Sequence, residues 1–142
     1  MNEGDILKKI LELSKKSFDL DEVPVGAIIV KNGVVIGEGI NDREHSHLIT
    51  GHAEINAIND ACIKSSDWRL DDCDMYVTLK PCMMCTGALI ESRIKNVFYL
   101  CDRTNVRFDD YSSLDLKKID NIYFENMYLD LLKKFFENKR IW

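Results

Sequence analysis

A two-stranded hairpin near the amino terminus is the sequence feature that most restricts the fold. Residues 23–30 form an apolar, β-branched run, and a second apolar run covers residues 34–36. Asn32-Gly33 between them supplies two residues that readily adopt a positive φ, as a tight two-residue hairpin turn requires. The sequence therefore predicts a pair of antiparallel strands, which any fold of this chain must contain.

Helices and strands alternate around this hairpin. Helical periodicity and helix-start signals predict helices over residues 6–18, about 52–64, about 81–93 and the C-terminal segment, whereas apolar runs predict strands over residues 75–79, 97–100 and 119–124. Residues 41–51 and 102–113 are polar and are expected to be connections. The pattern favours the α/β class, as a three-layer α/β/α sandwich with a mixed five-stranded sheet.

Two of these helices have stripes that predict which side is buried. In the helix that starts near residue 52, we expect Ile55, Ile58 and Cys62 to face the core. The C-terminal helix has an apolar stripe that is more typical of helix packing than of a base-stacking platform. The stripe consists of Tyr128, Leu131, Leu132, Phe135 and Phe136.

Length and composition indicate one domain over residues 1–142, with no stretch near the roughly 20 apolar residues of a membrane span. Acidic residues stand at the amino terminus, where a secretory signal would be basic, so the expected location is the cytoplasm. The net charge is −5 and the pI about 5.2. Because phosphate contacts supply most non-specific nucleic-acid affinity, any nucleic-acid surface must be a local patch.

Two short segments carry candidate metal ligands. His52-Ala53-Glu54 opens one predicted helix, and Pro81-Cys82-Met83-Met84-Cys85 opens another. One histidine and two cysteines would give zinc three protein ligands and leave a fourth position for water, which is the catalytic arrangement. The positive end of the second helix favours thiolates, and the i, i+3 spacing puts both sulfurs on one face. His52, Cys82 and Cys85 are therefore the predicted ligands of one Zn²⁺ per chain.

Glu54 is the candidate for proton transfer. Bound zinc lowers the pKa of its water from 15.7 to about 7, but a base must still collect the proton. Glu54 lies two residues from His52, and a carboxylate that moves protons should not itself be a ligand. We therefore expect Glu54 to be the general acid and base.

The same residue types also occur in sites without catalytic function. A C-x-x-C pair alone also occurs in structural zinc ribbons and redox proteins. A ribbon needs a second cysteine pair of similar spacing, which this chain lacks, and a redox pair would leave H-x-E unexplained. The remaining cysteines are expected to be buried thiols, and the nearby cationic residues to be surface or hydrogen-bonded groups. These residues are Cys62, Cys73, Cys101, Arg43, His45 and His47.

Six segments together resemble the tRNA-specific adenosine deaminase family, a group of cytidine deaminase-like zinc hydrolases whose signature is H-x-E with P-C-x-x-C. The segments are residues 21–27, 37–41, 52–54, 66–70, 76–79 and 81–85, and the resemblance covers about residues 5–100. It implies hydrolysis of adenosine to inosine at the wobble position of a tRNA anticodon stem-loop. It also implies a homodimer.

The same resemblance assigns substrate-binding roles. Asn41 would hydrogen-bond the flipped base, although asparagine is also a common turn residue. Val23 would line the base pocket, and Pro81 with Cys82 would help to position the attacking water. A purine also fits the physical scheme, in which the backbone around Ala53 can read the base edge.

Departures from the family pattern leave the substrate open. Lys80 stands where the family usually has Glu before Pro-Cys, and residues 102–113 replace a loop that usually contains Gly and Lys. One alternative is therefore a deaminase of a free base or nucleoside, of the cytosine or guanine type, with Trp142 as a lid. Another is a non-catalytic zinc-bearing subunit that binds tRNA, against which Glu54 argues, since a structural site does not need that carboxylate.

Overall fold

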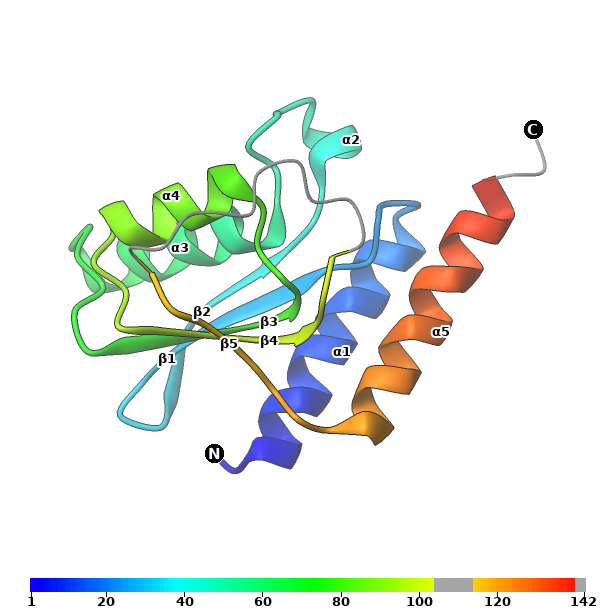
Figure 1. The fold of residues 1–142 in the computed structure, drawn as a ribbon. Coiled ribbons are helices and arrows are strands. Elements are labelled where there is room, and N and C mark those ends of the chain that lie inside the picture. Colours follow the sequence, from blue (N-terminus) through cyan, green and yellow to red (C-terminus); the bar gives the residue numbers. More distant parts are fainter. Residues whose placement is uncertain (104–113, 140–142) are drawn as a thin grey trace.

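The computed structural model describes residues 1–103 and 114–139, and in it a five-stranded sheet lies between two layers of helices (Figure 1). Helices α3 and α4 cover one face, and α1 and α5 cover the other. The elements are α1 (Glu3–Asp19), β1 (Gly26–Lys31), β2 (Val34–Ile40), α2 (Arg43–Ser46), α3 (Ala53–Ser65), β3 (Cys73–Leu79), α4 (Met83–Glu91), β4 (Asn96–Cys101), β5 (Leu116–Lys118) and α5 (Ile122–Lys139).

The sheet is mixed, as the sequence predicted. Its strand order is β2-β1-β3-β4-β5. β1 runs antiparallel to both β2 and β3, whereas β3, β4 and β5 are parallel. The predicted hairpin is confirmed, since Asn32 and Gly33 form its turn with φ of 50° and 75°. The three-layer α/β/α class is therefore confirmed.

The inner strand β1 contributes to the cores on both faces of the sheet through its alternating side chains. Ala27 and Ile29 point to the layer of α3 and α4, whereas Ile28 and Val30 point to the layer of α1 and α5. A strand that is buried on both faces reads as a continuous apolar run, which is the pattern seen in the sequence. Among the described residues, no helix combines the length and apolarity needed to cross a bilayer.

The predicted strand over residues 119–124 is wrong. The fifth strand is β5, which ends at Lys118, and α5 begins at Ile122. The side chain of Asn121 accepts a hydrogen bond from the backbone N–H of Phe124 at 3.2 Å, and its carbonyl accepts from Glu125 at 3.0 Å. This N-terminal cap starts a helix at a place where the apolar run, taken by itself, predicts a strand.

The predicted buried face of α3 is partly wrong. Ile58 is buried, but Ile55 and Cys62 are only half-buried, and the fully buried stripe is Ala53, Ala57 and Ala61. The cause is close approach to β2, where a Cβ on Gly37 would lie 2.6 Å from the carbonyl oxygen of Ala57. Small residues on both elements let helix and strand touch through their backbones.

The stripe of α5 packs as predicted at two positions. Tyr128 and Phe135 are buried, whereas Phe136 is 46% exposed, so its prediction as a core residue is wrong. The Tyr128 hydroxyl donates to the carbonyl oxygen of Pro24 at 2.6 Å, which ties α5 to the segment before β1. The predicted lid residue Trp142 lies outside the described residues, as does most of the connection over residues 102–113.

Candidate metal centre and active-site pocket

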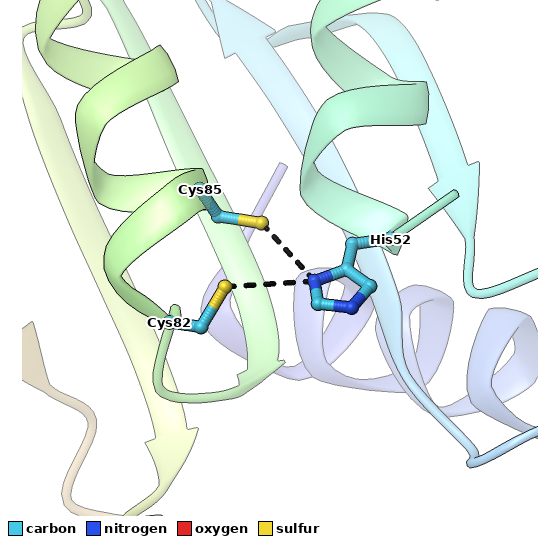
Figure 2. A group of neighbouring side chains, drawn as sticks. All are labelled: His52, Cys82 and Cys85. Atoms are coloured by element: carbon cyan, nitrogen blue, oxygen red, sulfur yellow. Dashed lines mark hydrogen bonds between the residues drawn. The ribbon is translucent and has the colours of Figure 1, made fainter. Parts of the chain in front are cut away.

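The candidate ligands come from the starts of two helices. His52 is the N-cap of α3 and Cys82 is the N-cap of α4, and neither side chain makes a capping hydrogen bond. Cys85 lies in the first turn of α4. Pro81 was expected in that first turn but precedes the cap, because α4 begins only at Met83 and ends at Glu91. Figure 2 shows all three side chains converging between the two helices.

Sheet topology brings these two helix starts together. β2 and β3 lie on either side of β1 and both run antiparallel to it, so they point in the same direction. α3 follows β2 through a connection that holds α2, and α4 follows β3. Both helices therefore begin at the same edge of the sheet, with their N-terminal N–H groups and positive dipole ends toward the site.

The spacing of the donor atoms suits zinc. The Nδ1 atom of His52 lies 3.6 Å from the Sγ atom of Cys82 and 3.5 Å from that of Cys85. All three ligand atoms lie within 4.8 Å of one another. Tetrahedral zinc with ordinary Zn–S and Zn–N bonds places a sulfur and a nitrogen about 3.6 Å apart. The three residues fit a zinc ion in number, chemistry and spacing.

The electrostatics of the two cysteines also suit a metal site. The Cys85 thiol hydrogen-bonds the Cys82 sulfur and, with His52, lowers the pKa of Cys82 well below its usual range. The same bond, with burial, raises the pKa of Cys85. The hydrogen bond with Cys82 raises the pKa of His52. Thiolates are the form of cysteine that binds zinc. Cys82 is therefore already in that form, whereas Cys85 would have to release its proton when the metal binds.

Glu54 lies beside these ligands, and its side chain is almost completely buried. It is 4% exposed, and burial raises the pKa of its carboxyl to about 7, against the smaller opposing effects of its own backbone N–H, His52 and Arg103. A carboxyl with a pKa near neutrality can both take up and release a proton at physiological pH. Its environment therefore suits the predicted role in proton transfer.

A pocket of about 1060 Å³ opens over this centre. Its walls include the predicted residues Val23, Asn41 and Ala53 together with His52 and Glu54. The other walls come from α2, from the ends of β3 and β4, and from α5. Pro81 is buried and is not among the lining residues.

The side chain of Asn41 is held in one orientation. Its Nδ2 atom donates to the carbonyl oxygen of Val23 at 3.0 Å, and its Oδ1 atom accepts from the N–H of Arg43 at 3.5 Å. Asn41 therefore bonds the backbone locally, as asparagines in turns do. An amide carries two N–H donors and two acceptor lone pairs, so one of each remains for a ligand.

Glu22 is a structural residue of this site that the sequence reasoning missed. It is 1% exposed, and its carboxylate accepts from the backbone N–H of Glu44 at 3.1 Å, from that of His45 at 2.8 Å and from His45 Nδ1 at 2.8 Å. The N-cap of α2, Asp42, makes no side-chain cap bond. Glu22 therefore caps the short helix α2 from a distant segment, in a region predicted to be loop. The only hint in the sequence is that this acidic residue directly precedes the apolar run of residues 23–30.

The family model of the MafB19-like deaminases matches residues 1–140. A tRNA-specific adenosine deaminase of Streptococcus pyogenes serotype M1 is 41% identical over 108 residues, which cover 76% of this chain. The match spans 62% of the length of that relative.

Two solved structures share both fold and sequence. One, from a study of A-to-I editing by tRNA deaminases at the wobble position of transfer RNA, has a TM-score of 0.72 at 31% identity and covers 80% of this chain and 95% of its own. The other, a guanine deaminase from Bacillus subtilis, has a TM-score of 0.69 at 40% identity and covers 73% of this chain and 67% of its own. The chain therefore belongs to the MafB19-like deaminase family and is a relative of the tRNA-specific adenosine deaminases.

Proposed function

We propose that this protein hydrolytically deaminates adenosine to inosine at the wobble position of a tRNA anticodon. The observation that carries this proposal is the placement of His52, Cys82 and Cys85 at zinc-binding distances, with Glu54 lining the pocket beside His52. The protein acts in this proposal as a single domain over residues 1–142, with one Zn²⁺ per chain.

His52, Cys82 and Cys85 would hold the zinc. The ion would supply the Lewis acidity that makes water nucleophilic at neutral pH. Glu54 would take the proton that the water loses when its oxygen bonds C6 of the purine. The same carboxyl would pass that proton to N1 of the ring. It would then take the second proton from the new C6 hydroxyl and pass it to the amine, so that the C–N bond breaks, ammonia leaves and inosine remains.

The remaining pocket residues would hold the base. Val23 supplies an apolar wall, and the free donor and acceptor of Asn41 would bind the nucleoside. Ala53 is the first residue of α3, where backbone N–H groups have no partner within the helix and can bind the base edge. Pro81 and Cys82 would fix the turn before α4 and with it the position of the attacking water.

Two observations favour a polynucleotide over a free base. The S. pyogenes relative is named as acting on tRNA, and so is the structure with a TM-score of 0.72. The pocket, at about 1060 Å³, is at the upper limit of ordinary small-molecule sites, which leaves room for nucleotides beside the reacting one. We further propose that the protein works in the cytoplasm, where tRNA is found, and as a homodimer.

The test measures inosine formation by the zinc-loaded protein on an anticodon stem-loop with adenosine at the wobble position. Free cytosine, guanine and adenosine are assayed in parallel. Inosine in the RNA alone supports the proposal. Turnover of a free base alone would show that the protein is a free-base deaminase, like the guanine deaminase that it resembles. No turnover of any of them, with normal zinc content, would favour the non-catalytic subunit.

A further inference from the structure

Two cationic residues stand at neighbouring strand ends on one side of the pocket. Lys80 directly follows β3, and its backbone N–H donates to the carbonyl oxygen of Cys101 at 2.9 Å. Arg103 follows β4 by two residues, and both cations line the pocket that contains Glu54. β3 and β4 are adjacent and parallel. Ligands of α/β proteins commonly bind beyond the carboxyl ends of such strands.

Lys80 is held by an aromatic ring. Its Nζ atom lies 5.6 Å from the ring centroid of Tyr99. Burial, together with a hydrogen bond to Asp102, raises the pKa of Tyr99 to about 12, so the tyrosine stays protonated and its hydroxyl engages that carboxylate. The acidic residue closest to Arg103 in sequence is thus occupied by Tyr99. A cation held over a ring keeps its N–H donors for a ligand.

No carboxylate of the described residues forms an ion pair with Lys80 or Arg103. Arg103 lies close enough to Glu54 to lower the pKa of that carboxyl, so its charge acts within the active site. By contrast Lys139, another cation of the pocket wall, pairs with Asp21. In a chain with a net charge of −5, two cations that no described carboxylate pairs form a local anion-attracting patch at one pocket edge.

We propose that Lys80 and Arg103 form a phosphate subsite that binds a phosphodiester next to the reacting nucleotide. Arginine binds phosphate oxygens with a planar pair of donors, and lysine binds them as a point charge. A free base has no such group, so the subsite would favour a polynucleotide over a base. The inference rests on the proposed function for the reacting base and adds the contact that holds its strand.

The test is binding of fluorescein-labelled anticodon stem-loop RNA to the full zinc-loaded chain, followed by fluorescence anisotropy at several salt concentrations. The RNA carries either adenosine or guanosine at the wobble position. Lys80→Met and Arg103→Met remove one charge each and keep much of the side-chain bulk. Lys95→Met is the matched control, because Lys95 is exposed and precedes β4, at the opposite edge of the sheet.

We expect each pocket variant to weaken binding about threefold to tenfold near 0.1 M salt. Each should also reduce the slope of log Kd against log salt by about one. Lys95→Met should match the wild type, and Lys80→Arg should retain the wild-type slope. Zinc content and circular dichroism of every variant exclude metal loss and misfolding as causes.

The outcomes separate this inference from the proposed function. Wild-type affinity and slope in both pocket variants would overturn the subsite even if inosine forms. Charge-dependent binding without inosine formation would support the subsite and reject the proposed activity. Deamination of adenosine 5′-monophosphate with a Lys80-dependent KM, but no RNA binding, would assign the phosphate to a free nucleotide and overturn the phosphodiester contact.

Discussion

His52 and Cys82 occupy the same position in two neighbouring helices, each as an N-cap residue with an extended backbone. Their φ and ψ angles are −89° and 152° for His52, and −74° and 176° for Cys82. N-cap side chains usually bond the N–H groups of their own first turn, but neither of these does. Each instead turns toward the other, with 3.6 Å between Nδ1 and Sγ. The two helix starts therefore direct their N-cap side chains toward the candidate zinc site in place of capping.

The first prediction concerns the metal. Cys82→Ala should weaken zinc binding by more than the roughly 100-fold that changes outside the ligand shell cost, because a ligand itself is lost. α4 should persist, because the Cys82 side chain makes no cap bond. Zinc per chain after dialysis against a metal buffer measures the effect. Cys62→Ala is the control, since Cys62 contacts the carbonyl oxygen of Trp68 and belongs to no group of candidate metal ligands within residues 1–103 and 114–139. Equal zinc content in both variants would remove Cys82 from the ligand set.

The second prediction concerns proton transfer. Glu54→Gln keeps the shape of the side chain but removes its basicity, so kcat should fall about 10²- to 10⁴-fold. Zinc content should stay at the wild-type level, because Glu54 is not one of the three grouped ligands. Asp60→Asn makes the same chemical change on α3, but Asp60 instead accepts from the N–H of Glu38 and from Lys64. A kcat loss as large in Asp60→Asn would show that the effect is structural.

A third prediction follows from the pKa of Glu54 in the metal-free chain. The folded protein holds this proton up to a pKa of about 7, whereas the unfolded chain releases it near the ordinary glutamate pKa of 4.5. The folded state therefore binds more protons between these values, and its free energy of unfolding falls as pH rises through that window. Above pH 7 the burial of a charged carboxylate remains a constant cost.

Urea unfolding of chelator-treated protein measures this dependence. Glu54→Gln lacks the titrating group, so its stability advantage over the wild type should grow by a few kcal/mol from pH 4.5 to pH 7. His52 and Cys82 titrate in both proteins, and their contribution largely cancels in the difference. A difference that stays constant across this range would show that Glu54 does not titrate as its burial implies.

The sequence identified the residues of the candidate metal site more completely than the contacts around them, for a physical reason. His52, Cys82 and Cys85 lie in short motifs whose local spacing already encodes the chemistry. Glu22 acts through contacts 22 and 23 residues away in the chain, at Glu44 and His45, and no local pattern reports such a pairing. Long-range contacts of this kind depend on the folded topology.

The errors in the fold have a similar origin. Hydrophobic periodicity identified β1 and its hairpin, because that strand is buried on both faces. It failed for residues 119–124, where Asn121 starts a helix, and on α3, where the tightest contacts involve alanines and glycines. Large apolar residues dominate a periodicity argument, whereas backbone proximity is carried by small ones.

The fourth prediction tests Glu22 as the cap of α2. Glu22→Gln keeps the size of the side chain but replaces a charged acceptor of three hydrogen bonds with a neutral amide. Hydrogen bonds to charged groups contribute about 1.5–3 kcal/mol each, so we expect a loss of at least about 2 kcal/mol in the free energy of unfolding. Urea unfolding with zinc bound gives this value. Glu12→Gln, on the exposed side of α1, should change it by less than about 0.5 kcal/mol. Equal effects at the two positions would contradict the cap.

The last prediction compares two glycines that differ in the space around them. A Cβ on Gly39 would overlap the carbonyl oxygen of Ala53 and the backbone nitrogen of Ala57, neither of which can move without shifting α3. At Gly87, inside α4, a Cβ would meet nothing within 4 Å. Alanine is favoured over glycine in helices by about 0.5–1 kcal/mol, so Gly87→Ala should stabilise the protein by that amount.

Gly39→Ala should instead destabilise the protein by about 1–3 kcal/mol or more, as overpacking does. Because Ala53 adjoins both His52 and Glu54, the displacement should also lower zinc affinity and kcat, which Gly87→Ala should leave unchanged. Thermal unfolding and zinc titration of both variants measure these effects. If Gly39→Ala lost stability but kept its zinc affinity, α3 would tolerate the shift away from β2, and the backbone contact at Gly39 would support the fold without positioning the metal site.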